Sequence, residues 1–378
     1  MAENKDKKVL NVPVLRFSEF SGEWKEERLD KIAELSKGIG ISKEQLSEDG
    51  ESCILYGELY TKYKSEIINK VISKTNIETS KLKRSKQNDV IIPCSGETAI
   101  DIAVARCIPF DDVLLGGDLN VIRLHKDNGS FIAYQLNGKR KTDIAKLAQG
   151  VSVVHLYGEN LKAIKTYNPC LQEQQKIVRL LSILDERIST QNKIIDKFQS
   201  LIKGLAVALT TKGKPNTAIS QCLECHSSAL QESEVMPNGL YKVFGANGLV
   251  GYTDVPQMNG DAILVIKDGS GVGTVSYAQG KFSVIGTLNY LTVIGNNDLR
   301  YLYFALSVFN FQPYKTGMAI PHIYFKDYGK AKIYCPSLAE QKRVANVLDK
   351  LESKLFVEQE LLALFNQQKQ YLLRKMFI

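Results

Sequence analysis

The amino-acid sequence predicts an α+β protein in which two mixed α/β domains are separated by two long antiparallel helices that form a coiled coil. The first observation is an internal repeat, because residues 150–209 align with residues 317–376 without a gap. The second is a heptad pattern of apolar residues in both copies. The third is that the segments ahead of the two copies share little sequence. A chain organised in this way has a pseudo-two-fold repeat.

Each copy of the repeat contains a short strand-like stretch that ends at a proline and leads into Leu-x-Glu-Gln. Proline near the first helical turn, with a glutamate close behind it, is a signal for the start of a helix. The residues that recur in register include Gly150, His155, Tyr157, Pro169, Glu173 and Gln174, which return as Gly317, His322, Tyr324, Pro336, Glu340 and Gln341.

The apolar positions after each Glu-Gln step alternately by four and three residues over about five heptads. The predicted seam of the helix pair comprises Leu181, Leu184, Ile188, Gln191, Ile195 and Phe198 in the first copy and Leu348, Leu351, Leu355, Glu358, Leu362 and Phe365 in the second. Gln191 and Glu358 interrupt it at matching positions, and Lys369 takes the register of Ile202. Polar seam residues lower stability but can fix the register.

Helices of roughly 38 residues would be about 57 Å long, far beyond the average for a globular domain. A single amphipathic helix usually packs on the nearest core. Two copies with one heptad register are instead expected to bury each other's seam as an antiparallel pair.

The predicted domain order is a variable domain at residues 1–169, a long helix at 170–212, a second variable domain at 213–336 and a second long helix at 337–378. Both variable domains are expected to mix helices and strands. In the first we expect strands at 53–56 and 90–93, a turn at 114–120 and a polar helix at 130–148. In the second we expect strands at 261–267 and 273–277 around a glycine turn and a helix at 299–310.

The composition favours a globular cytoplasmic protein. The chain has 378 residues, of which 44% are hydrophobic, but no apolar run is long enough to span a membrane. Residues 1–8 are polar and lack the apolar core of a signal peptide. Seven cysteines, an odd number in a chain with no secretory signal, are expected to be free thiols.

The net charge of +8 is unevenly placed. Between Lys62 and Lys86 the sequence has eight Lys and Arg residues against only Glu66 and Glu78. Basic surfaces bind nucleic acid by releasing counterions, so this stretch is a candidate DNA surface. A solvated charged face is the plainer alternative.

The motifs of several catalytic classes are missing. There is no Walker-type Gly-x4-Gly-Lys-Ser/Thr, and no two of the ten prolines are adjacent, as an Asn-Pro-Pro-aromatic methyltransferase motif would require. The glycine run 269–273 leads into a strand pattern, so we expect a hairpin turn and not a dinucleotide loop. Cys222, Cys225 and His226 lack a second cysteine pair, so no metal site is expected. For the repeated His155 and His322 a structural hydrogen bond is favoured over DNA contact. We therefore expect no catalytic residues.

The chain resembles the specificity subunits of type I restriction–modification enzymes across essentially its full length. The duplicated proline, Leu-x-Glu-Gln and long-helix modules carry the resemblance most specifically. Supporting segments are Leu15-Arg16-Phe17, Glu23-Trp24, Tyr56 to Tyr60, Asp89 to Pro93, Ser95-Gly96-Glu97, Tyr241 to Gly245, Asn247-Gly248 and Gly251-Tyr252. The chain departs from the pattern near 217–229, where the Leu-Arg-Phe and Glu-Trp signature has no clear counterpart.

The resemblance implies two target-recognition domains that each read one half of an interrupted double-stranded DNA site, with the helix pair as a ruler for the gap. It also implies two adenine methyltransferase subunits that bind S-adenosylmethionine, motor-nuclease subunits that use ATP and Mg²⁺, and no membrane partner. None of those activities or cofactors would belong to this chain. The alternative is a coiled-coil scaffold or dimerisation protein that does not bind DNA.

Candidate DNA contacts divide into phosphate-binding cations and base-reading polar groups. Individually, each lysine is more often a solvated surface charge. The predicted phosphate contacts are Lys62, Lys64, Lys81, Lys83, Arg84 and Lys86 in the first domain and Lys242, Lys281 and Lys315 in the second. The predicted base readers, which we expect on exposed loops, are Tyr63, Ser95, Arg140, Asn247, Tyr252, Lys267 and Ser270.

Overall fold

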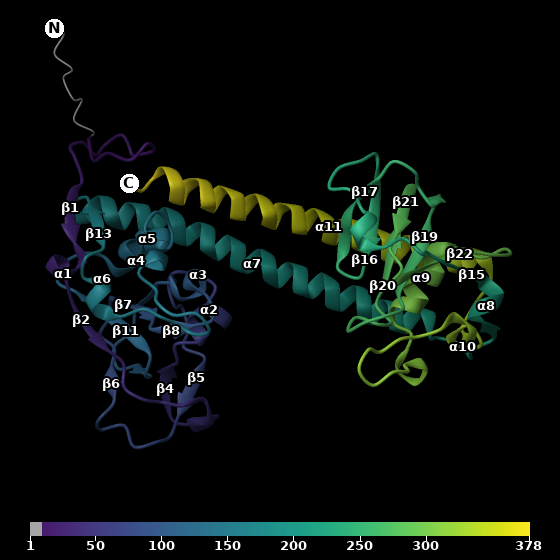
Figure 1. Ribbon diagram of the computed structural model, residues 1–378, viewed down its shortest axis with the longest axis horizontal. Helices are drawn as coiled ribbons and strands as arrows, with labels where there is room; N and C mark the ends of the chain where they lie inside the picture. The colour runs from purple at the N-terminus through teal and green to yellow at the C-terminus, as the bar shows by residue number, and fades with distance from the viewer. Residues whose placement is uncertain (1–9) are drawn as a thin grey trace, which may run out of the picture. The chain divides into compact units, whose positions relative to one another are not determined.

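The computed structural model describes residues 10–378, so the polar N-terminal residues 1–8 lie outside its described part. The chain forms two compact units (Figure 1). Unit 1 comprises the residues up to Gln191 together with Leu361–Ile378, and unit 2 comprises Asn192–Glu360. The long helices α7 (Leu171–Thr210) and α11 (Leu338–Lys375) each contribute one part to each unit. The predicted four-part division places its boundaries at the helix ends, whereas the compact units divide both helices near the middle.

Unit 1 is built on a four-stranded antiparallel sheet and a second, five-stranded sheet. The first has the order β2 (Ala33–Lys37), β11 (Leu119–Leu124), β7 (Asp89–Pro93), β9 (Arg106–Ile108). All five residues of β7 are buried, as a near-continuous apolar run requires. The second sheet has the order β3 (Leu46–Ser47), β5 (Ser73–Thr75), β4 (Glu51–Ile54), β10 (Leu114–Leu115), β6 (Lys83–Arg84).

Unit 2 repeats the first of these sheets with unrelated residues. Its order is β15 (Leu223–Ser227), β22 (Leu288–Val293), β19 (Ala262–Ile266), β20 (Val275–Ala278), again with every pair antiparallel. A second four-stranded sheet has the order β17 (Gly248–Thr253), β16 (Tyr241–Gly245), β21 (Lys281–Val284), β18 (Met258–Asn259). The two variable domains therefore share a topology that their sequences do not reveal.

The same start-of-domain arrangement also occurs in both units. In unit 1, β1 (Lys25–Arg28) pairs with β13 (Lys165–Asn168) and leads through α1 (Leu29–Ile32) into β2. In unit 2, β14 (Thr217–Ala218) pairs with β23 (Lys332–Ile333) and leads through α8 (Ile219–Cys222) into β15. The missing counterpart near 217–229 thus concerns the Leu-Arg-Phe and Glu-Trp residues, not the fold.

One helix in each unit packs on the antiparallel four-stranded sheet: α4 (Gly129–Asn137) on β7 and β9 in unit 1, and α9 (Leu299–Ser307) on β19 and β20 in unit 2. The N-cap side chains Asn128 and Asp298 accept hydrogen bonds from backbone N–H groups three residues later. The expected single helix at 130–148 is wrong, because α4 ends at Asn137, with Gly138 as its C-cap, and α5 (Lys141–Lys146) follows. Gly138 packs against Leu373 of α11, and glycine is the residue that most readily ends a helix.

The remaining short elements connect these layers. They are α2 (Glu58–Thr61), β8 (Ser95–Gly96), α3 (Ala99–Ile102), β12 (Val154–His155), α6 (Gly158–Leu161), α10 (Phe325–Tyr328) and 3-10 turns at Lys43–Gln45, Glu232–Glu234 and Gln312–Tyr314.

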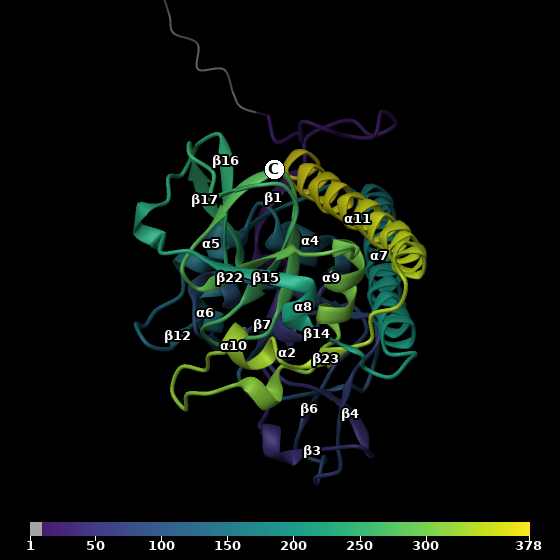
Figure 2. The ribbon, with the colours of Figure 1, turned by 90° about the vertical axis from the view of Figure 1, so that its right-hand side faces the viewer.

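The helix pair is antiparallel, as we expected from the sequence, because within each unit the start of one long helix lies beside the end of the other (Figures 1 and 2). In unit 1 the start of α7, with Leu181 and Leu184, shares a core with Leu372 and Met376 at the end of α11. In unit 2 the end of α7 shares a core with Val344 and Leu348 at the start of α11. The seam positions Leu181, Leu184, Gln191, Ile195 and Leu348 are buried, and Ile188, Phe198, Leu351, Leu355, Glu358, Leu362 and Phe365 are half-buried.

The glutamine of the repeated Leu-x-Glu-Gln joins each long helix to its domain. The backbone N–H of Asn128, the N-cap of α4, donates to Gln174 Oε1 at 2.9 Å, and that of Asp298, the N-cap of α9, donates to Gln341 Oε1 at 2.8 Å. Both glutamines are buried. A buried amide that loses these partners is costly, so the motif is retained in both copies for a structural reason.

Candidate nucleic-acid interface

The basic stretch 62–86 lies around the five-stranded sheet of unit 1. Two of its cations are engaged within the protein: Lys62 Nζ lies 2.6 Å from Glu58 Oε1, and Arg84 Nη1 lies 2.6 Å from Glu51 Oε2. Lys64, Lys81 and Lys86 are exposed and Lys83 is half-buried, without an ion pair within residues 10–378. Lys70 and Lys74 are likewise exposed and form no ion pair in this range, so six of the eight cations of the stretch remain available to an external anion.

Two of the predicted base readers are not on exposed loops. Tyr63 is buried, and its hydroxyl accepts a hydrogen bond from the Ile72 backbone, while burial raises the pKa of Tyr63 to about 12. Ser95 is also buried, and its hydroxyl donates to Asp118. The expectation of surface positions is wrong for both, because Tyr63 packs in a core with Leu59 and Ile68, and Ser95 lies in the strand Ser95–Gly96, which pairs with Val154–His155. Arg140 is half-buried, pairs with Asp143 and donates to the Ile378 carbonyl.

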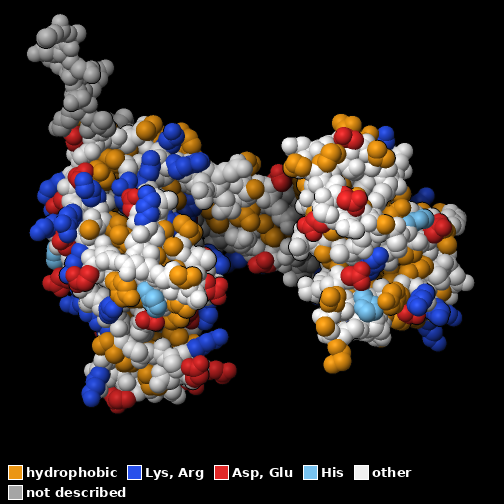
Figure 3. Space-filling view, in the orientation of Figure 1, with side chains coloured by type: hydrophobic (Ala, Val, Ile, Leu, Met, Phe, Trp, Pro, Cys, Tyr) orange, Lys and Arg blue, Asp and Glu red, His pale blue; other side chains and the backbone are white. Residues whose placement is uncertain are grey.

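Unit 1 contains a cavity of about 570 Å³ that gathers basic side chains from distant parts of the chain. Its rim carries Lys64, Lys139, Lys141 and Arg374, which come from the loop after α2, the α4–α5 turn and the end of α11. We call these four residues the basic rim. Figure 3 shows Lys and Arg side chains spread over the visible face of unit 1 more densely than over that of unit 2.

The floor of this cavity is electrically balanced. Lys369 Nζ lies 2.5 Å from Glu66 Oε2 and 2.6 Å from Asp185 Oδ1. Arg106 is buried and donates to the backbone carbonyls of Leu59 and Tyr63, and burial lowers its pKa. The two cations of the floor therefore face two carboxylates.

The basic rim has no such compensation, because none of its four residues forms an ion pair in the described part of the chain. The cavity as a whole presents an excess of positive charge to solvent, which favours an anionic ligand.

Sequence reasoning singled out Lys64 from this rim but missed Lys139, Lys141 and Arg374. The run Lys139-Arg140-Lys141 was a visible signal, although it drew attention only to Arg140. Arg374 gave no such signal, since only the antiparallel return of α11 brings it to this domain.

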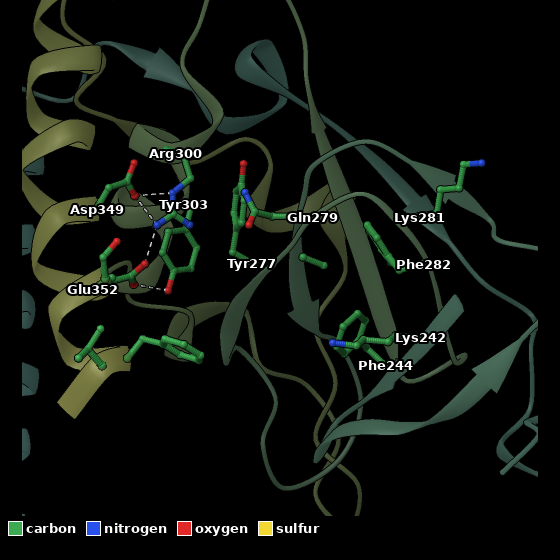
Figure 4. Close-up of a pocket in the computed structure, with 14 residues that line it drawn as sticks. Lys242, Phe244, Tyr277, Gln279, Lys281, Phe282, Arg300, Tyr303, Asp349 and Glu352 are labelled. Carbon is green, nitrogen blue, oxygen red and sulfur yellow. Dashed lines mark hydrogen bonds and ion pairs between the residues drawn. The ribbon is translucent and has the colours of Figure 1, made fainter. Parts of the chain in front are cut away.

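Unit 2 brings Lys242 and Lys281 to a cavity of about 900 Å³ (Figure 4). Aromatic side chains, among them Tyr277 and Phe282, line it between the two lysines and the helices. At the helical side, Arg300 Nε donates to Asp349 Oδ1 at 2.6 Å and its Nη2 to Glu352 Oε2 at 2.5 Å.

Arg300 lies over the Tyr277 ring at 4.3 Å. Burial opposes its charge, but the hydrogen bonds and charges of Asp349 and Glu352 outweigh this and raise its pKa. The guanidinium is thus satisfied by the protein itself, and Lys242 and Lys281 are the cations of this cavity that face solvent without an ion pair in residues 10–378.

The other predicted residues of unit 2 are not gathered in one place. Asn247 and Ser270 are exposed, whereas Tyr252, Lys267 and Lys315 are half-buried. The glycine run 269–273 connects β19 to its antiparallel partner β20, so it forms the expected hairpin turn.

The residues considered for metal binding are used otherwise. His226 Nε2 lies 2.9 Å from Thr292 Oγ1 and its ring stacks on Tyr290. Cys222 Sγ is 3.9 Å from Cys335 Sγ, and all seven cysteines are free. Within residues 10–378 no three His, Cys, Asp or Glu side chains form a group suited to a metal ion, and no helix there has the length and apolarity to cross a bilayer.

Comparison with known proteins gives a family match over most of the chain. The family described as "Type I restriction modification DNA specificity domain" matches residues 21–199 and 225–365. A curated relative, the type I restriction enzyme EcoprrI specificity subunit of Escherichia coli, is 25% identical over 114 residues. That match spans 30% of this chain and 28% of the relative's length.

Two solved structures have a similar fold. A crystal structure of a type I restriction–modification S subunit from M. genitalium has a TM-score of 0.66 at 18% identity and covers 97% of this chain and 99% of its own. A structure described as the basis of complex assembly and conformational transition of the type I restriction–modification system has a TM-score of 0.53 at 16% identity and covers 94% and 97%. At these identities the likeness concerns the fold.

Proposed function

The chain belongs to the family of type I restriction–modification DNA specificity proteins, and from that premise we propose that it recognises a bipartite double-stranded DNA site, with one half-site for each variable domain. The observation that carries this proposal is that the sheets β2-β11-β7-β9 and β15-β22-β19-β20 have the same strand order but are formed by unrelated sequences. Each sheet domain is joined to an equivalent long helix through the same buried glutamine. Two domains with the same fold and different side chains suit two half-sites of different sequence.

We infer further that the chain is a cytoplasmic, non-catalytic subunit that directs two adenine methyltransferase subunits and motor-nuclease subunits to the site. S-adenosylmethionine, ATP and Mg²⁺ would then be bound by those partners. Phosphate contacts would come from the basic rim of unit 1, from Lys81, Lys83 and Lys86, and from Lys242 and Lys281 in unit 2. These cations support the proposal because they are free of ion pairs within the described residues.

The basic rim can be tested through the salt dependence of DNA binding. We expect the variant Lys139→Gln/Lys141→Gln/Arg374→Gln to lower the slope of log affinity on log salt by about two to three, since each phosphate contact contributes about 0.9. Fluorescence anisotropy of a duplex of mixed sequence with the full chain measures this slope.

A matched control changes three exposed lysines of unit 1 that lie outside the cavity, Lys31, Lys43 and Lys126, to glutamine. The control slope should equal that of the wild type. Equal slopes in the rim variant and the wild type would remove the rim from the interface, and a wild-type chain that binds no DNA would overturn the proposed function itself.

The ruler role of the helices predicts a longer gap when both are lengthened. Inserting one heptad after Gln191 and one after Glu360 adds about 10 Å, or about three base pairs at about 3.4 Å each. We expect methylome sequencing of a host with this variant to show unchanged half-sites separated by about three more base pairs. An unaltered gap with methylation retained would contradict the ruler.

A scaffold or dimerisation protein without DNA binding is the competing proposal, and the antiparallel helix pair by itself is compatible with it. A mobility-shift assay of the chain with its methyltransferase partner distinguishes a scaffold from a DNA-binding protein. The assay uses a duplex that contains the sequence methylated in the host, and a scaffold would leave this duplex unshifted.

A further inference from the structure

Both copies of the repeat begin with a tight hairpin. In unit 1 the backbone groups of Gln149 and His155 exchange two hydrogen bonds, of 2.9 and 2.7 Å. In unit 2, Thr316 and His322 do the same, at 2.9 and 2.8 Å. These bonds use the backbone of the two histidines, so they do not test the predicted structural role of the side chains; His322 Nδ1 lies 3.3 Å from the Ile320 carbonyl oxygen.

A glycine fixes the shape of each hairpin. Gly150 has a φ of +123° and Gly317 a φ of +88°, a region that favours glycine. A Cβ atom would lie 2.1 Å from the Val153 carbonyl oxygen at Gly150 and 2.3 Å from the Ile320 oxygen at Gly317. Both loops are therefore closed by the same pair of backbone hydrogen bonds and have a glycine with positive φ at the same position of the repeat.

Apolar side chains point into solvent from both loops. We call Val151, Val153 and Tyr157 the tip of unit 1, and Met318, Ile320 and Tyr324, which occupy the same repeat positions, the tip of unit 2. All six are exposed, and Val151 and Met318 are as exposed as in an extended chain, at 99% and 106%. Exposed apolar side chains at equivalent places in both units are typical of a surface that a partner covers.

The chemistry of the tips favours a protein partner over DNA. Neither segment 149–157 nor segment 316–324 contains a Lys, Arg, Asp or Glu residue. Cations supply most of the attraction to phosphates, and neither tip has one, so the Val, Met and Ile side chains of the tips suit an apolar pocket.

The sequence repeat also indicates what kind of partner would bind the two tips. The variable surfaces of the two units differ, as expected if they meet different DNA sequences, whereas the tips lie in the part of the chain that is repeated. A feature that is the same in both units is explained by a ligand that is the same at both.

We propose that each tip inserts into an apolar pocket on one copy of a protein subunit that binds twice to this chain, once at each tip. This inference rests on the proposed function, under which the subunit present in two copies is the adenine methyltransferase.

The test uses the full chain and the purified methyltransferase subunit of the same system. Sedimentation velocity should show two methyltransferase subunits per wild-type chain. We expect Val151→Ser/Val153→Ser and Met318→Ser/Ile320→Ser each to bind only one tightly, with the affinity for the second weakened at least about tenfold, and the combined variant to bind none tightly. Because these side chains are exposed, the thermal unfolding of the variants should match the wild type.

The control is Val255→Ser, an exposed apolar residue of unit 2 outside the repeat, which should retain both subunits. Two subunits bound with unchanged affinity by the tip variants would overturn the inference. So would a loss of affinity for duplex DNA with the stoichiometry still two, which would make the tips DNA contacts, or a wild-type dimer that the tip variants dissociate. Wild-type chain that binds DNA but no methyltransferase would count against the proposed assembly instead.

Discussion

Replacing Lys369 with methionine is expected to destabilise unit 1 by about 3–5 kcal/mol, the loss typical of a broken buried ion pair. Lys369 lies in the helix seam, where its ammonium group pairs with Glu66 and Asp185. Asp185 also accepts hydrogen bonds from the hydroxyls of Tyr134 and Ser65. Methionine fills similar space but leaves two buried carboxylates without their cation.

Urea denaturation followed by tryptophan fluorescence measures this effect, because Trp24 is the only tryptophan of the chain and is buried in unit 1. Lys31→Met, at an exposed position of unit 1 itself, is the matched control and should change the free energy of unfolding by less than about 0.5 kcal/mol. A loss below about 1 kcal/mol in Lys369→Met would show that the cluster is not needed for stability.

The pH dependence of this effect follows from the charge of Lys369. Burial would lower its pKa, but the charges and hydrogen bonds of Glu66 and Asp185 outweigh burial and raise it above the ordinary 10.5. A raised lysine pKa stabilises the fold at and below neutral pH, and this contribution is lost as the pH rises through the folded-state value. The difference between wild type and Lys369→Met should therefore be constant near neutrality and shrink only above about pH 10.5.

The second large effect is expected from Glu173→Gln, which removes about 2–4 kcal/mol of stability. Glu173 is 1% exposed, and its carboxylate accepts hydrogen bonds from Arg16 Nε at 2.8 Å, from Arg16 Nη2 at 2.7 Å and from Trp24 Nε1 at 3.3 Å. The bond to Glu173 also raises the pKa of Arg16. Glutamine cannot balance the Arg16 charge.

The repeat supplies the control for this variant. Glu340 occupies the equivalent position, but its side chain is 32% exposed and lies 3.6 Å from Lys212 and from Arg343. Exposed pairs at such distances contribute little, so Glu340→Gln should cost less than about 1 kcal/mol. Denaturation followed by circular dichroism compares both variants, and equal losses would refute this account of the two positions.

These contacts explain why the Leu-Arg-Phe and Glu-Trp signature occurs once. Arg16 and Trp24 bind the glutamate of the first copy of the repeat, whereas within residues 10–378 Glu340 of the second copy has only the longer contacts with Lys212 and Arg343. The signature is thus a structural device of unit 1, whereas the strand, short helix and strand that follow it occur in both units.

The two long helices with their heptad pattern, the repeat, and the strands at 90–93 and 261–267 could be predicted from the sequence alone. Each depends on periodicity or on residues close together in the chain, and such patterns persist wherever the segment lies. The glycine turn at 269–273 is predictable for the same reason. The single helix predicted at 130–148 was wrong although Gly138 is a local signal for a helix end, because the apolar pattern continues past it into α5.

By itself, the sequence determined that two equivalent long helices each follow a mixed domain, since the heptad and the repeat are properties of one segment at a time. The antiparallel pairing that we expected from it is a contact between distant segments, which the tertiary structure decides. The tertiary structure alone decided that Glu173 is buried and Glu340 is not, that Tyr63 is buried, and that Arg374 joins Lys139 and Lys141 at one rim. Those outcomes depend on which distant segments meet. Burial and charge pairing are set by the whole surroundings of a side chain, which identical local sequences do not share.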